Sequence, residues 1–171
     1  MTTTRDAGAL MRRRTDRFLE CVGGMTGEQW LYRPPSGGWS VSEVTEHVAT
    51  SNRGVLGRLR NGLETPLPGP LGVADDEIPF LFYLGDEPPG VATPTGEWTD
   101  LSTAVAEFDT RAQAVVDFAA ETDLDLREHG CSHPIFGVLD GAQWLLFAGA
   151  HTERHRRQLI GYQLQPDFPV A

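Results

Sequence analysis

Apolar residues recur every three or four positions in four long segments of this chain, and this periodicity constrains its fold more than any other feature. The segments cover approximately residues 6–22, 41–61, 99–120 and 140–164. No segment of useful length alternates between polar and apolar residues as a half-buried strand does. The sequence therefore predicts an all-α fold, and four helices with one long crossover connection favour a four-helix bundle.

Two of the predicted helices have a recognisable start. Ser40 and Glu43 have the spacing of a capping box, in which each side chain bonds the backbone N–H of the other residue. Asp140 and Gln143 repeat this spacing before the last segment. We therefore expect the second helix to begin near Val41 and the last helix to begin near Asp140.

A long connection separates the second predicted helix from the third. Residues 62–97 contain seven prolines and six glycines, too many for a helix, so we expect an irregular connection at about residues 61–97. Its apolar middle, residues 78–84, either packs against the bundle, closes over a pocket or forms a subunit contact. The 171 residues otherwise suit one domain, residues 1–171.

The charge balance argues against nucleic-acid binding. Arginine supplies all 14 positive charges, and 24 acidic residues bring the formal net charge to −10. Such a surface opposes phosphate contacts. No segment approaches the ~20 apolar residues of a membrane span, and the N-terminus lacks the apolar core of a signal peptide. We expect a cytoplasmic protein whose two cysteines, Cys21 and Cys131, stay reduced.

Three of the five histidines stand where the helical pattern expects an apolar residue. His47 follows Val44 by three positions on the inward stripe of the second helix. His151 and His155 are four positions apart on the inward face of the last helix, so their side chains lie one turn apart. Burying imidazoles is costly unless each has a partner.

A divalent metal ion would satisfy all three imidazoles, because neutral imidazole is a common ligand of zinc, nickel and iron. Three protein ligands also leave one coordination position open, as in catalytic sites. The alternative is a set of histidines hydrogen-bonded in a metal-free core. A metalloprotease is disfavoured, since Glu153 comes two residues after His151 and is turned roughly 200° around the helix from it.

Other candidate residues give weaker signals. Cys131 and His133 could form a nucleophile and base, although loop residues this close usually have no catalytic relation. Glu43 lies one turn before His47 and could orient it, but the capping box already explains Glu43. Gln158, three residues after His155, is either a hydrogen-bonding partner of the site or an amide at the edge of the core.

Three separated blocks of the sequence resemble the DinB superfamily. They are WSVSEVTEHVA at residues 39–49, HPIFG at residues 133–137 and WLLFAGAHTERHRRQ at residues 144–158. The resemblance covers roughly residues 8–165, with the blocks in the order and spacing of the family. It implies a four-helix bundle in an up-down-down-up arrangement, with a long connection between its second and third helices. It also implies that His47, His151 and His155 hold the metal.

The resemblance implies chemistry less definitely than fold. Members with known activity mostly transfer or use low-molecular-weight thiols such as bacillithiol, mycothiol or glutathione, and others are described as metal-dependent hydrolases. We expect a metal-dependent enzyme, either a thiol-dependent transferase or a hydrolase, with zinc or nickel ahead of iron or manganese. The absence of lysine suggests a GC-rich genome and hence mycothiol. A small-molecule substrate and a homodimer are expected, and the rival is a non-catalytic metal-binding or small-molecule-binding stress protein.

Overall fold

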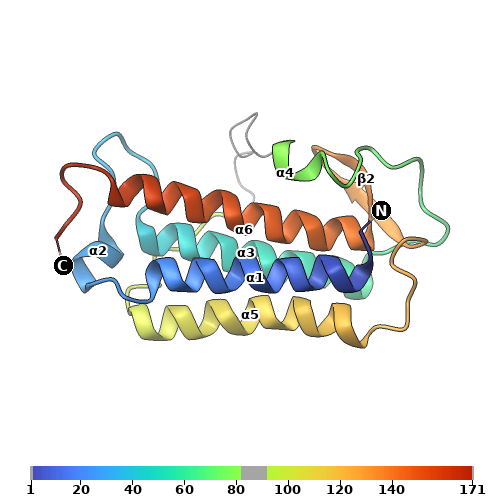
Figure 1. Ribbon diagram of the computed structural model, residues 1–171, viewed down its shortest axis with the longest axis horizontal. Coiled ribbons are helices and arrows are strands. Elements are labelled where there is room, and N and C mark those ends of the chain that lie inside the picture. Colours follow the sequence, from blue (N-terminus) through green and yellow to red (C-terminus); the bar gives the residue numbers. More distant parts are fainter. Residues whose placement is uncertain (1, 82–91, 171) are drawn as a thin grey trace.

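The computed structural model describes residues 2–81 and 92–170, and four long helices form the centre of this described part (Figure 1). They are α1 (Thr4–Val22), α3 (Val41–Asn61), α5 (Leu101–Glu121) and α6 (Gly141–Gln163). The smaller elements are α2 (Gly27–Leu31), α4 (Ile78–Leu81), β1 (Gly130–His133) and β2 (Gly137–Asp140). The chain is therefore mostly helical, with a small two-stranded sheet at one end.

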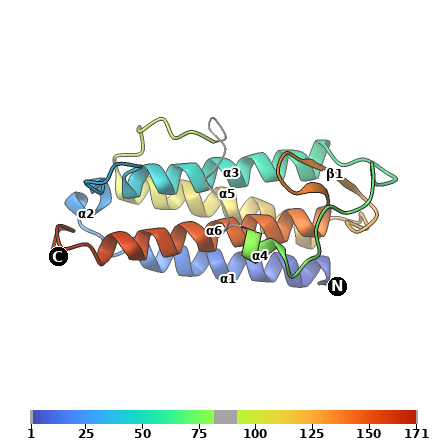
Figure 2. The ribbon, with the colours of Figure 1, turned by 90° about the horizontal axis from the view of Figure 1, so that it is seen from above.

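Each long helix packs against two others. The helix α1 contacts α5 and α6, and α3 contacts the same two helices. Figure 1 shows α1 and α6 running in one direction and α3 and α5 running in the other. Seen from above in Figure 2, α3 and α6 lie side by side. Side chains that project from these two antiparallel helices can therefore meet between them.

Two groups of buried apolar side chains fill the bundle. The first includes Met11, Leu59 and Leu145, and the second includes Phe18 and Phe108, whose rings stack at 4.6 Å between centroids. Burying each such side chain contributes about 1.5–3 kcal/mol. Within the described residues, no helix combines the length and the apolar run that crossing a membrane requires.

The helix starts predicted from capping boxes are confirmed. Ser40 caps α3, with its hydroxyl accepting the Glu43 N–H while the Glu43 carboxylate accepts the Ser40 N–H. Asp140 and Gln143 form the same reciprocal pair at the start of α6. Each pair satisfies two backbone N–H groups that have no partner inside the helix.

Two short elements differ from the predictions. Cys131 and His133 were expected to lie in a loop, but β1 pairs antiparallel with β2, with Cys131 opposite Leu139. Strands of four residues are too short for alternation to identify them. The short helix α2 lies between the first two predicted helices, where no helix was predicted, and Thr26 and Gln29 form its capping box.

The long connection after α3 is tied to the hairpin. Its first part forms isolated β-bridges with the hairpin. Glu64 pairs with Gly130 of β1, and Leu71 pairs with Val138 of β2. Ile78 in α4 is fully buried in the first core group, so this part of the apolar middle packs against the bundle. Residues 82–84 of the same predicted segment lie outside the described residues.

Candidate metal centre

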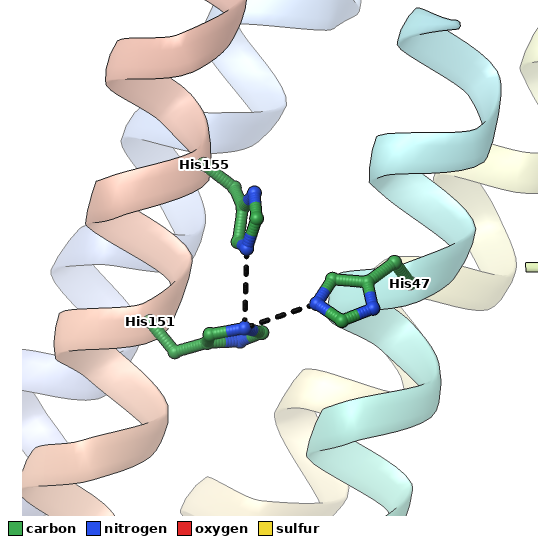
Figure 3. Close-up of side chains that lie close together, drawn as sticks. All are labelled: His47, His151 and His155. Carbon is green, nitrogen blue, oxygen red and sulfur yellow. Dashed lines mark hydrogen bonds between the residues drawn. The ribbon is translucent and has the colours of Figure 1, made fainter. Parts of the chain in front are cut away.

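Three imidazoles meet in the space between α3 and α6 (Figure 3). His47 projects from α3, while His151 and His155 project from successive turns of α6. All three are buried, with exposed fractions of 1%, 4% and 2%. The Nε2 atom of His151 lies 3.1 Å from Nε2 of His47 and 3.1 Å from Nε2 of His155. The structure thus brings together the three residues that the sequence singled out.

The outer nitrogen of His47 faces a backbone carbonyl. Nδ1 of His47 lies 2.9 Å from the carbonyl oxygen of Ala92. A carbonyl oxygen only accepts hydrogen bonds, so the proton of the neutral imidazole is on Nδ1. The Nε2 atom of His47 consequently presents its lone pair to the other two histidines.

A chain of hydrogen bonds fixes the proton of His155 in the same way. Tyr162 donates its hydroxyl proton to the carbonyl oxygen of Trp39 at 3.1 Å, and it accepts a hydrogen bond from Nε2 of Gln158 at 2.8 Å. The other end of this amide, Oε1 of Gln158, accepts the Nδ1 proton of His155 at 2.7 Å. The Nε2 lone pair of His155 therefore points toward His151, and Gln158 is a direct partner of the site.

The converging nitrogens suit a cation. His47 and His155 both direct lone pairs at Nε2 of His151, a neutral imidazole nitrogen that carries one proton at most. The 3.1 Å separations are close to the about 3.3 Å between two nitrogen ligands of a tetrahedral zinc ion. All three ligand atoms lie within 4.8 Å of one another. The residues present therefore fit a divalent transition-metal ion.

Aromatic rings surround the three imidazoles. The Trp39 ring lies 4.6 Å from the His47 ring, measured between centroids. Phe147 stacks on His151 with an interplanar angle of 5° and a centroid distance of 5.9 Å. These rings restrict the rotation of the imidazoles and lower the local dielectric constant, which strengthens electrostatic interactions at the centre.

Glu43 has a structural position. Its carboxylate accepts the Ser40 N–H at 2.8 Å and pairs with Arg33 at 2.7 Å. Burial opposes its ionisation, but the hydrogen bonds from Arg33 and Ser40 outweigh burial and lower the pKa of Glu43. These contacts belong to the cap of α3 and do not orient His47.

The pair of Cys131 and His133 lacks the features of an activated nucleophile. Nδ1 of His133 accepts hydrogen bonds from the backbone N–H groups of Ile135 and Phe136 at 3.1 and 3.3 Å. Burial and the charge of Arg58 lower the pKa of His133 to about 4, and burial raises the pKa of the Cys131 thiol. A nucleophilic cysteine needs a lowered thiol pKa, so this pair fits a structural role.

Two partners near the site were missed from the sequence. Ala92 contributes only its backbone oxygen, for which a side-chain pattern gives no signal. Glu46, next to His47, is 4% exposed and bonds the segment that follows Ala92. A carboxylate beside an inward-facing histidine could have been noted, but its partner lies 49 residues further along the chain.

The model of one protein family matches residues 10–159, and that family is the DinB superfamily. The matched span covers most of the 171 residues and contains all three histidines. The chain belongs to the DinB superfamily. Membership confirms the resemblance seen in the three sequence blocks and agrees with the mostly helical fold of this DinB protein. Comparisons with curated proteins and with solved structures find no match.

Proposed function

We propose that this DinB-superfamily protein is a metal-dependent enzyme whose ion is held by His47, His151 and His155. The observation that carries the proposal is the convergence of three buried Nε2 atoms, two of which have their protons held on the far side of the ring. Zinc and nickel suit three imidazoles best, and iron or manganese are further candidates. A bound ion would act as a Lewis acid that lowers the pKa of a water or thiol.

The chain itself supplies the orientation of the ligands. Ala92 and Gln158 hold the Nδ1 protons, so the two imidazoles cannot turn without losing these hydrogen bonds. Trp39 and Phe147 pack on the rings of His47 and His151, and all three imidazoles are buried from solvent. Three protein ligands leave room for a substrate atom, which is the pattern of catalytic zinc sites.

We propose transfer to or from a low-molecular-weight thiol as the reaction class. Membership of the DinB superfamily supports this part, with mycothiol as the first thiol to test and a small molecule as the second substrate. The directions of the long helices in Figure 1 are in keeping with an up-down-down-up bundle of one domain. A cytoplasmic location and a homodimer stay predictions from the sequence.

Thiol-dependent turnover tests this proposal. The protein is loaded with zinc or nickel and incubated with mycothiol, bacillithiol or glutathione together with small electrophiles, and thiol consumption is followed. We expect turnover that requires both metal and thiol and that is lost in His47→Ala. Hydrolysis of esters or amides without a thiol would assign the protein to the metal-dependent hydrolases, and metal binding without either reaction would contradict an enzymatic role.

A further inference from the structure

Residues 92–98, here called the 92–98 segment, lie against the first half of α3 beside His47. Figure 2 shows this yellow-green stretch alongside α3 before it leads into α5. Both ends of the segment are hydrogen-bonded to other parts of the bundle. At one end the oxygen of Ala92 accepts the Nδ1 proton of His47, and at the other the oxygen of Trp98 accepts the Nε1 proton of Trp30 at 2.9 Å.

The middle of the segment is held by one carboxylate. Oε1 of Glu46 accepts the backbone N–H of Thr95 at 2.8 Å and its hydroxyl proton at 2.7 Å. Oε2 of Glu46 accepts the N–H of Gly96 at 3.0 Å. Consecutive N–H groups that converge on one anion fix the local backbone, and hydrogen bonds to an ionised acceptor are roughly twice as strong as neutral ones.

The backbone of the segment needs such support. Ala92 has a φ of 50° and Gly96 a φ of 77°, both in the left-handed region. Glycine adopts this region freely, whereas alanine does so only when its surroundings impose it. Glu46 is only 4% exposed. Burial of a carboxylate is costly unless it is hydrogen-bonded, so the bonds from Thr95 and Gly96 in turn stabilise the Glu46 side chain. Carboxylate and segment thus stabilise each other.

Glu46 and His47 are neighbours on α3, and Ala92 and Thr95 are three positions apart on the segment. We propose that Glu46 is a positioning residue of the metal centre. By holding Thr95 and Gly96, it keeps the oxygen of Ala92 on Nδ1 of His47 and so keeps the Nε2 lone pair of His47 directed at the centre. The role in metal binding rests on the proposed function, whereas the effect on the proton of His47 does not.

The test compares Glu46→Gln with a matched control on the same helix, Glu43→Gln. Glu43 also accepts hydrogen bonds from its surroundings, but they belong to the helix cap and to Arg33. Nitrogen NMR of metal-free protein labelled in histidine shows which ring nitrogen of His47 carries the proton. Competition with a chelator then gives the zinc affinity. Thr95→Val serves as a second variant. It removes the hydroxyl bond to Glu46 and the bond that this hydroxyl accepts from the Glu97 N–H, and it leaves both backbone bonds to Glu46 in place.

We expect His47 to be protonated on Nδ1 in the native protein and in Glu43→Gln, and to be a mixture of both tautomers in Glu46→Gln. Zinc affinity should fall roughly 10-fold or more in Glu46→Gln, less in Thr95→Val and not at all in Glu43→Gln. A His47 proton that stays on Nδ1 in both Glu46→Gln and Thr95→Val would overturn the positioning role. If the native protein binds no zinc, the proposed function fails, and the tautomers still decide the role of Glu46.

Discussion

Gln158 accepts the Nδ1 proton of His155 at 2.7 Å, one turn along α6 from the histidine it orients. The amide cannot turn over, because its Nε2 donates to Tyr162, whose hydroxyl proton is given to a backbone carbonyl. A neutral side chain therefore decides which nitrogen of a buried imidazole faces the centre. Replacing such a partner of a metal-ligating histidine typically lowers metal affinity about 10–100-fold.

Replacing Gln158 should weaken metal binding without removing a ligand. In Gln158→Leu the His155 ring loses its Nδ1 partner, so we expect roughly a 10-fold lower zinc affinity by chelator competition. Gln163→Leu is the control, because this exposed amide of α6 donates to Cys21 and not to a histidine. Equal zinc affinities of the Gln158 and Gln163 variants would show that the Gln158 amide does not affect metal binding.

Zinc should stabilise the folded protein. An ion that binds only the native state adds about 2.7 kcal/mol at 100 times its dissociation constant, which for a chain of this size raises Tm by roughly 5–10 °C. A chelator should reverse the shift, and the double variant His151→Ala/His155→Ala should show none of it. Thermal unfolding followed by circular dichroism measures this, and an equal shift in the double variant would place the ion elsewhere.

Replacing Arg127, whose side chain is 16% exposed, should lower the free energy of unfolding strongly. It lies between Asp75 and Asp140, at 2.7 and 2.8 Å, and the Asp140 side chain is only 1% exposed. Arg127→Met leaves a buried carboxylate without its cation, so we expect a loss of about 3–5 kcal/mol in urea unfolding. Arg12→Met, which breaks pairs with the more exposed Asp16 and Asp109, should cost less than about 1 kcal/mol. Similar costs for both variants would contradict this assignment.

His133 should make stability depend on pH. Burial and Arg58 lower its folded pKa from 6.5 to about 4, so the unfolded chain binds more protons between these values. The contribution of neutral His133 is therefore fully present above pH 6.5 and is lost as pH falls toward 4. Urea unfolding in the presence of a metal chelator should show that the native protein loses stability relative to His133→Phe as pH falls from 6.5 toward 4. A constant difference between the two proteins would argue against a buried neutral imidazole.

The sequence predicted those features that depend on local patterns. Inward-facing positions on two helices identified His47, His151 and His155, and the structure brings all three together because α3 and α6 are neighbours. Capping-box spacing located the starts of both helices to within a residue. Helical periodicity and capping are set by residues three or four apart, so one sequence is sufficient to detect them.

Features that depend on distant or backbone partners could not be predicted. The orientation of His47 comes from a carbonyl 45 residues later, in an irregular segment without periodicity. The chain of hydrogen bonds from His155 through Gln158 and Tyr162 ends on the carbonyl oxygen of Trp39, 123 residues before Tyr162. The hairpin of β1 and β2 was missed because four-residue strands carry too few positions for a pattern. Tertiary contacts determine the first two features, and local backbone pairing determines the hairpin.

Metal content tests the central proposal most directly. Untagged protein and the variant His151→Ala/His155→Ala are purified side by side and measured by elemental mass spectrometry. We predict near one equivalent of zinc, nickel or another divalent transition metal in the native protein and its loss in the folded double variant. A well-folded native protein that holds no such metal, even after incubation with zinc and nickel, would contradict the proposal.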